Sequence, residues 1–148
     1  MPDRTSAAAL SQPRIDLALA VLRVVTGSVF AAHGAQKLFV YGFAGVTGAF
    51  TQMGIPLPGV AGPAVALVEF FGGLALVVGL LTRLGALGLA VTMLGAILFV
   101  HLQGGFFMPT GSEFALTLLG SAVALALAGP GALALDAVVA RRRTTAIA

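Results

Sequence analysis

Six residues in the first apolar stretch of the chain share one helical face. Successive members are 7, 3, 4, 3 and 4 positions apart, and at 3.6 residues per turn this spacing forms a single stripe. The stripe consists of Asp16, Arg23, Thr26, Phe30, His33 and Lys37. Imidazole, ammonium and carboxylate groups hydrogen-bond ligands and transfer protons. The stripe therefore predicts a helix face turned into a bundle that contains a polar site.

Three further ionisable residues fall at positions where they can join this site. Glu69 lies within the second apolar stretch, His101 ends the third, and Glu113 begins the fourth. Counting about 1.5 Å per residue places Arg23 and Glu69 at nearly the same depth. Helix side chains lean toward their own N-terminus, so the Arg23 and Glu69 side chains lean in opposite directions. Glu69 is therefore available to His33 or to a ligand. We predict His33, Glu69, His101 and Glu113 as the residues that hydrogen-bond the reacting group or carry protons.

Each of these residues also has a structural interpretation. Lys37 can extend to the lipid headgroups, and Arg23 can pair with Glu69 to specify helix packing. Thr110 and Glu113 fit a capping box, in which the glutamate reaches back to the N–H of the cap residue. His101 can be an ordinary interfacial histidine.

The sequence contains no motif that identifies a cofactor. Its lack of cysteine excludes a thiol relay, a disulfide, an iron–sulfur site and a covalently attached haem. His33 and His101 could hold a b-type haem, and these two residues with Glu113 could hold a zinc ion. Two histidines without further sequence context do not identify either site, so we predict no metal site. No nucleotide-binding loop or nucleophile elbow is present.

The composition is that of a polytopic membrane protein. Of the 148 residues, 59% are hydrophobic and only 9% are charged, and the mean hydropathy is +1.06. Soluble domains contain about 25% charged residues, so the partner of this surface is the lipid bilayer. The few basic residues are scattered or flank apolar runs, which argues against nucleic acid as a partner.

Four apolar runs predict an all-α membrane protein with a four-transmembrane-helix bundle. A short interfacial or re-entrant helix is expected between spans one and two, where apolar residues recur at helical spacing. A tight "TRLG" turn is expected between spans two and three, and Pro13 is expected near the start of span one. The predicted regions are an N-terminal arm (1–14), a transmembrane domain (15–129) and a basic tail (130–148). The predicted spans are 15–39, 60–81, 84–102 and 113–128.

Lysine and arginine counts predict the orientation of these spans. In a four-span arrangement one side carries nearly all of the basic residues, and the other side carries only Lys37. The basic side contains Arg4, Arg14, Arg83, Arg141, Arg142 and Arg143. Both termini are therefore expected to be cytoplasmic, in a multi-pass protein of the membrane.

Five segments in order resemble the DoxX-like membrane proteins, over nearly all of residues 17–136. The segments are "LRVVTGSVFAAHGAQKLF", "EFFGGLALVVGLLTRLGA", "VHLQGGFF", "EFALTLLG" and "GPGALALD". The resemblance implies a four-helix protein of the bacterial cytoplasmic (cell inner) membrane that anchors an oxidoreductase complex. It further implies quinone-linked work in sulfur, thiol or oxidative-stress metabolism, with superoxide dismutase-like or sulfurtransferase-like soluble partners. The connection after the first span departs from the family in having no Trp.

Our leading hypothesis is a redox-system subunit that binds a quinone near the outer half of the bundle. Phe39 is expected to contribute an apolar wall. The residues predicted to bind the ligand are Arg23, Gln36, Lys37, Tyr41, Phe106 and Phe107. The alternatives are a non-catalytic scaffold that recruits soluble redox enzymes and a small transporter of a thiol or sulfur compound. The transporter would use an Arg23–Glu69 layer as its gate and would act as a homo-oligomer.

Overall fold

The computed structural model describes the backbone of residues 4–145 and the side chains of residues 11–142. Within residues 4–145 the chain is helical, without β-strands. The elements are α1 (Arg4–Ala35), η1 (Gln36–Tyr41), α2 (Gly42–Gln52), α3 (Pro58–Val78), α4 (Thr82–Ala96), η2 (Ile97–His101), η3 (Leu102–Gly104), α5 (Glu113–Ala128) and α6 (Leu135–Thr145). Of the short elements, η1 and η2 are π-helical and η3 is a 3₁₀ turn.

Three helical stretches within the described residues are long and apolar enough to cross a membrane. They are Ser11–Gln52, Pro58–Val78 and Thr82–Gly104. α5 is apolar as well, but its 16 residues make it shorter than these three. The all-helical fold and three long apolar helices are thus as the sequence predicts.

The first span differs from the prediction at both of its ends. α1 begins at Arg4, so that Pro13 lies inside the helix rather than near its start. The alanine-rich residues before Pro13 have high helix propensity and extend the helix toward the N-terminus. At the other end the helix continues past Phe39 through η1 and bends into α2 at Gly42, which has a φ of 65°.

The turn between α3 and α4 lies three residues earlier than predicted. α3 ends at Val78, and the turn consists of Gly79, Leu80 and Leu81. Gly79 has a φ of 72° and its N–H bonds the carbonyl of Ala75, so it ends α3 in the left-handed conformation typical of helix C-termini. The "TRLG" residues form the first turn of α4 instead.

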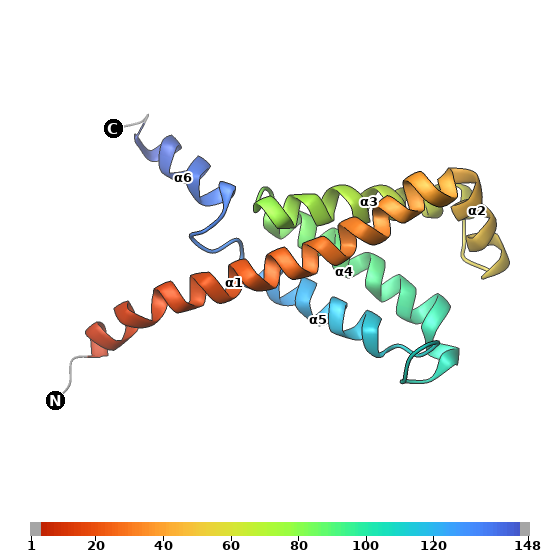
Figure 1. Cartoon of the computed structure of the whole chain (residues 1–148), viewed down its shortest axis with the longest axis horizontal. Coiled ribbons are helices and arrows are strands. Elements are labelled where there is room, and N and C mark those ends of the chain that lie inside the picture. The colour runs from red at the N-terminus through yellow and green to blue at the C-terminus, as the bar shows by residue number, and fades with distance from the viewer. Residues whose placement is uncertain (1–3, 146–148) are drawn as a thin grey trace.

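The helices are arranged as two pairs, with α1 packed along α3 and α4 packed along α5 (Figure 1). The short α3–α4 turn joins the pairs at the end near α6, which we name the α6 end. Toward the opposite end, the α2 end, α4 and α5 diverge from α3 (Figure 1). Glycines allow α1 to approach α3 closely. A Cβ atom on Gly73 would lie 2.4 Å from the backbone nitrogen of Ala31, and one on Gly34 would lie 2.3 Å from that of Phe70.

Arg23 connects three segments at the α6 end. It is 2% exposed, and its guanidinium donates hydrogen bonds to the carbonyls of Leu76 (2.9 Å), Val77 (3.1 Å) and Leu133 (2.6 Å). The last carbonyls of a helix lack partners within the helix, so Arg23 satisfies the C-terminus of α3. The alternative in which Arg23 pairs with Glu69 is therefore not formed, because the arginine leans toward its own N-terminus, as expected from the sequence, and bonds backbone oxygens.

Asp136 fastens the start of α6 to the α3–α4 turn. Its carboxylate accepts hydrogen bonds from the N–H groups of Leu81 (2.8 Å) and Thr82 (2.9 Å), and its own N–H donates to the Gly79 carbonyl (2.8 Å). Burial raises the pKa of the Asp136 carboxyl. The hydrogen bonds from Thr82 and Leu81, with the charge of Arg23, outweigh burial and leave that pKa below its usual value. A carboxylate here also suits the positive N-terminus of α4.

Replacing Gly73 by leucine tests the close contact between α1 and α3. The new side chain would meet the backbone of Ala31, which cannot move aside. Overpacking of this kind costs about 1–3 kcal/mol, so we expect a lower melting temperature in detergent micelles. Gly120→Leu is the matched control, because nothing lies within 4 Å of a Cβ atom placed there. Equal melting temperatures for the two variants would contradict the proposed contact.

Asp136→Asn tests the link between α6 and the α3–α4 turn. Because folding lowers the pKa of Asp136, the carboxylate stabilises the folded state above its unfolded pKa of about 3.9. At pH 7 we expect Asp136→Asn to have a lower melting temperature than the wild type. The free energy of unfolding should fall by about 1 kcal/mol, as for a lost helix cap. The gap should close only as the pH falls below 4 and through the lowered pKa of the folded Asp136 carboxyl, where the wild-type carboxylate becomes protonated. A gap that is the same at pH 7 and pH 3 would exclude this account.

Candidate functional site

A pocket of about 960 Å³ lies between the two helix pairs. Residues of α1, η1, α3, α4, η2 and α5 line it, together with residues from the end of α2 and the following loop. Most of the lining is apolar. Its polar side chains are His33, Lys37, Glu69, Thr92 and His101. The stripe that the sequence predicts on the first span therefore contributes to this pocket, together with Glu69 of the second span and His101 at the end of the third.

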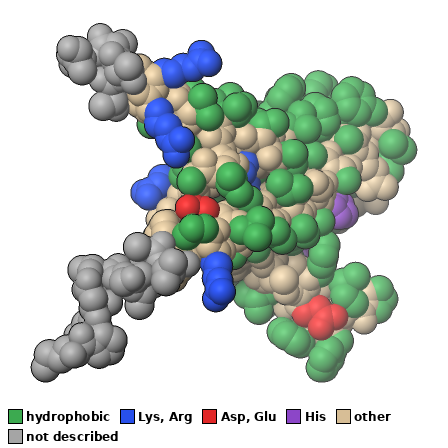
Figure 2. Space-filling model, turned by 60° about the vertical axis from the view of Figure 1, so that its left-hand side comes forward, with side chains coloured by type: hydrophobic (Ala, Val, Ile, Leu, Met, Phe, Trp, Pro, Cys, Tyr) green, Lys and Arg blue, Asp and Glu red, His purple; other side chains and the backbone are tan. Residues whose placement is uncertain are grey.

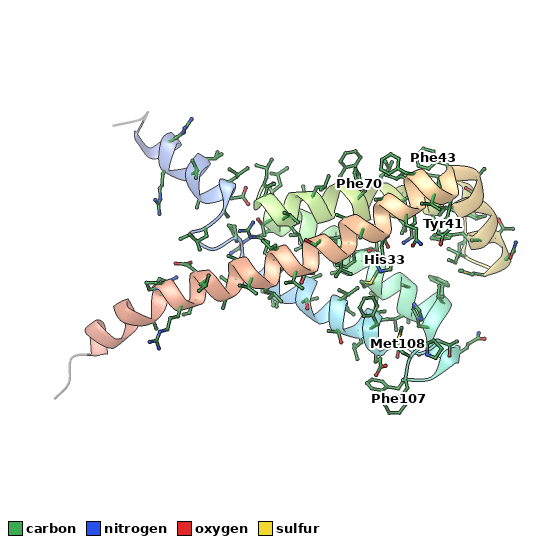
Figure 3. The ribbon with its side chains drawn as sticks, in the orientation of Figure 1. His33, Tyr41, Phe43, Phe70, Phe107 and Met108 are labelled. Atoms are coloured by element: carbon green, nitrogen blue, oxygen red, sulfur yellow. The ribbon has the colours of Figure 1, made fainter. Side chains whose placement is uncertain are left out.

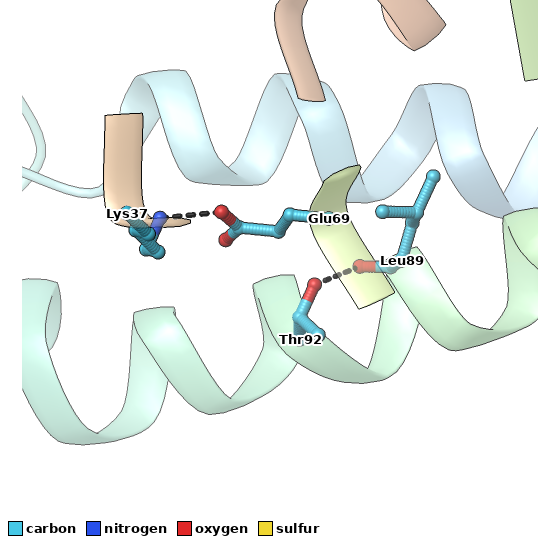
Figure 4. A network of polar contacts seen from close by, with 4 residues as sticks. All are labelled: Lys37, Glu69, Leu89 and Thr92. Atoms are coloured by element: carbon cyan, nitrogen blue, oxygen red, sulfur yellow. Dashed lines mark hydrogen bonds and ion pairs between the residues drawn. The ribbon is translucent and has the colours of Figure 1, made fainter. Parts of the chain in front are cut away.

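Lys37 and Glu69 form an ion pair within this pocket, between η1 and α3 (Figure 4). The Glu69 side chain is 4% exposed and that of Lys37 is 22% exposed. Pairing avoids the cost of burying the carboxylate alone, which is why the ammonium points inward. The prediction that Lys37 extends to the headgroups is therefore wrong. On neighbouring α4 the Thr92 hydroxyl donates a hydrogen bond of 2.8 Å to the Leu89 carbonyl (Figure 4).

Both histidines line the pocket, as the sequence predicts. His33 extends from α1 toward α5 (Figure 3), where its ring centroid lies 6.2 Å from that of Phe114. His101 lies on η2, and its Nδ1 is 3.2 Å from the carbonyl oxygen of Thr110 in the loop that follows. The two rings thus come from different helix pairs and reach the same pocket.

The π-helical stretches place key side chains of the site. η1 carries Lys37, and η2 carries Phe99, Val100 and His101, all of which line the pocket. A π-helical turn holds an additional residue, so it rotates the side chains that follow it, and such turns are frequent at functional sites. The 3–4 spacing of the sequence stripes gives no signal of these turns.

Glu113 is not among the residues that line the pocket. Its carboxylate accepts a hydrogen bond from the Met108 N–H (2.8 Å), and its own N–H donates to the Phe106 carbonyl (2.9 Å). The predicted capping box is wrong in its partner, because α5 begins directly after Ser112 and the carboxylate reaches Met108 rather than Thr110. Among the described side chains, no three of the His, Cys, Asp and Glu type gather closely enough to hold a metal ion.

The aromatic walls differ from those that the sequence predicts. Phe39 packs edge-on against Phe70, with ring centroids 5.6 Å apart. Phe106 and Phe107 pack against each other at 5.3 Å and are exposed outside the pocket. The aromatic side chains that line the pocket are Phe30, Phe50, Phe99 and Phe114. Phe30 lies on the stripe predicted for the first span, and Phe50 lies in the short helix predicted between spans one and two. Phe99 and Phe114 are not among the residues that the sequence predicts to bind the ligand.

A smaller pocket of about 350 Å³ adjoins the first between η1 and α2. Gln36 and Tyr41, both predicted to bind the ligand, line this smaller pocket. Lys37, Phe50 and Met53 line both pockets. Gln36 and Tyr41 are therefore close to the candidate site but lie in the space next to it.

Arg23 lines neither pocket, because its guanidinium is bound to backbone carbonyls at the α6 end. Glu69 is paired with Lys37 instead. The Arg23–Glu69 layer, which a transporter would have used as its gate, is therefore not formed.

Two family models match the chain. One is described as DoxX and matches residues 18–102, and the other is described as the TQO small subunit DoxD and matches residues 64–147. Together they include the ion pair, both histidines and the pocket walls. No solved structure matches the chain.

Three relatives illustrate the range of similar proteins. A Bacillus subtilis protein with the provisional name oxidoreductase CatD is 38% identical over 80% of this chain and 84% of its own length. A membrane protein of Mycobacterium tuberculosis is 32% identical over 95% of both chains. The inner membrane protein YqjF of Escherichia coli is 35% identical over 86% of this chain and 95% of its own. With a DoxX model covering more than half of its length, this membrane protein belongs to the DoxX family.

Proposed function

We propose that this protein is the integral membrane subunit of an oxidoreductase-associated system and binds a quinone, or a similarly apolar redox ligand, in the 960 Å³ pocket. The observation that carries the proposal is the pocket itself, in which an ion pair and two histidines converge within apolar walls. Small-molecule sites are typically cavities of about 300–1,000 Å³ with mostly apolar walls and a few polar groups. A quinone ring would sit near the polar groups, with its tail along Val68 and Val91.

The name of one relative and the description of one family model support a redox role for the pocket. One relative carries an oxidoreductase name, and one matching family model is described as the TQO small subunit DoxD. We extend this to quinone-linked work in sulfur, thiol or oxidative-stress metabolism, with superoxide dismutase-like or sulfurtransferase-like soluble partners. The chain's own residues would bind and orient the ligand and exchange protons with it, while electrons come from a partner.

In the membrane, we propose four spans with both termini cytoplasmic. α5 would be the fourth span, although its 16 residues reach only about 24 Å. Figure 2 shows most of the Lys and Arg side chains gathered at the α6 end, over a surface that is otherwise largely hydrophobic. An excess of basic residues marks the cytoplasmic side. α2 would then lie along or re-enter the opposite interface, next to the pocket.

A non-catalytic scaffold is the second candidate function. α6 projects from the bundle at the end opposite the pocket (Figure 1), and it carries the exposed Arg142. A soluble acidic partner could dock there without using the pocket. The two candidates are distinguished by ligand binding, because a scaffold has no need of a quinone.

Quinone binding to the purified protein tests the leading proposal. We expect a decyl-tailed benzoquinone to bind the protein in detergent micelles, as measured by calorimetry, and His33→Ala to weaken binding about tenfold, the equivalent of one hydrogen bond in a desolvated site. Phe99→Ala should also weaken binding because Phe99 lines the pocket. Phe107→Ala is the matched control, since Phe107 is 75% exposed outside the pocket. Absence of binding, or equal weakening by Phe107→Ala, would refute the proposal.

A double-mutant cycle tests the ion pair that organises the pocket. Lys37→Met leaves the Glu69 carboxylate buried without its partner, and we expect the free energy of unfolding to fall by about 3 kcal/mol. This value is the lower end of the range for a buried pair, because Lys37 is partly exposed. Lys37→Met combined with Glu69→Gln removes both charges and should recover most of the melting temperature in micelles. Additive losses in the double variant would show that the two side chains do not interact.

A further inference from the structure

The hydrogen bond of His101 determines which of its ring nitrogens is available to a ligand. Nδ1 lies 3.2 Å from the Thr110 carbonyl oxygen, and a carbonyl oxygen can only accept a hydrogen bond. Nδ1 must therefore carry the proton. In the neutral ring Nε2 is then unprotonated and can only accept. His101 is one of the residues that line the large pocket, so an unprotonated Nε2 would give the pocket a hydrogen-bond acceptor. Free histidine in water prefers the opposite tautomer.

The loop that carries Thr110 is held in one conformation by several contacts. The Glu113 carboxylate accepts from the Met108 N–H (2.8 Å), and the N–H of Ser112 donates to the Gly105 carbonyl (3.0 Å). The loop also packs tightly on itself, because a Cβ atom on Gly111 would lie 2.3 Å from the Phe106 carbonyl carbon. Glu113 is thus a positioning residue that acts on the site through the loop and His101.

The remaining polar groups of the pocket complement this acceptor. Among the described side chains, the titratable residues that line the pocket with His101 are His33, Lys37 and Glu69. The Lys37 ammonium bonds Glu69 Oε2 and has two further N–H groups, which could stabilise a negatively charged oxygen. The same pocket therefore contains an acceptor for a hydroxyl proton, at His101, and a cation, at Lys37.

We propose that the ligand of this pocket carries a phenolic hydroxyl group, as in a quinol, and that this hydroxyl donates to Nε2 of His101. When the hydroxyl ionises, its O–H bond breaks and the proton forms an N–H bond at Nε2. The oxygen keeps the electron pair as a phenolate beside Lys37, and no electron is transferred in this step. This inference rests on the proposed function and specifies it, because it selects the reduced, hydroxylated form of the ligand.

The tautomer of His101 is measurable without any ligand. The chain has two histidines, so ¹⁵N-histidine NMR of the protein in micelles, with His33→Gln for assignment, isolates the His101 ring. At pH 9, where an imidazole is ordinarily neutral, we expect the spectrum of a ring protonated at Nδ1. We expect the same in Glu113→Gln and in Thr110→Ala, which keeps the backbone carbonyl. Glu113→Ala and Gly111→Leu should shift the ring toward Nε2 protonation. A wild-type ring protonated at Nε2 would overturn the inference.

Ligand binding tests the hydroxyl requirement. Under anaerobic conditions we would compare decyl-benzoquinol with its dimethyl ether, which has the same ring and tail but no donor. We expect the quinol to bind about tenfold more tightly, the equivalent of one hydrogen bond, and His101→Ala to abolish this preference. Equal binding of both probes would overturn the hydroxyl assignment and leave the pocket as a quinone site. Binding of neither quinol, ether nor quinone would remove the proposed function and this inference together.

Discussion

In an apolar bundle a buried charge needs a partner, and this constraint decides where the polar side chains of the protein lie. Arg23 finds backbone carbonyls at the end of α3 and in the segment before α6. Glu69 finds Lys37, which is drawn inward from the end of the first span. The unpaired alternatives would cost several kcal/mol each. One end of the bundle is therefore tied together, while the other holds a polar pocket.

The two ends of the bundle differ in how firmly their helices are connected. At the α6 end, Arg23 and Asp136 connect α1, the α3–α4 turn and α6 through backbone hydrogen bonds. At the α2 end the two helix pairs diverge, and side chains from both pairs line the pocket. A fixed end supports the separation of the helices at the open end, so the pocket can be preformed rather than created by its ligand.

Helical periodicity was enough to predict much of this arrangement. The stripe of the first span places Phe30, His33 and Lys37 at the pocket, and His101, predicted at the end of the third span, lines it as well. Periodicity could not predict the partner of each charge, because depth along a helix says nothing about backbone carbonyls that accept from Arg23. It also could not predict the π-helical turns or the loop around Thr110, which depend on tertiary contacts. Four spans and the orientation of the termini stay predictions.

The central claim is that the pocket between the helix pairs holds an apolar redox ligand. Native mass spectrometry of the protein, purified gently from its own membranes, tests it most directly. We expect a bound quinone or quinol in the wild type and its loss when Gly88→Trp fills the pocket wall. Protein that carries only phospholipid, or a quinone that is retained when the pocket is filled, would contradict the claim.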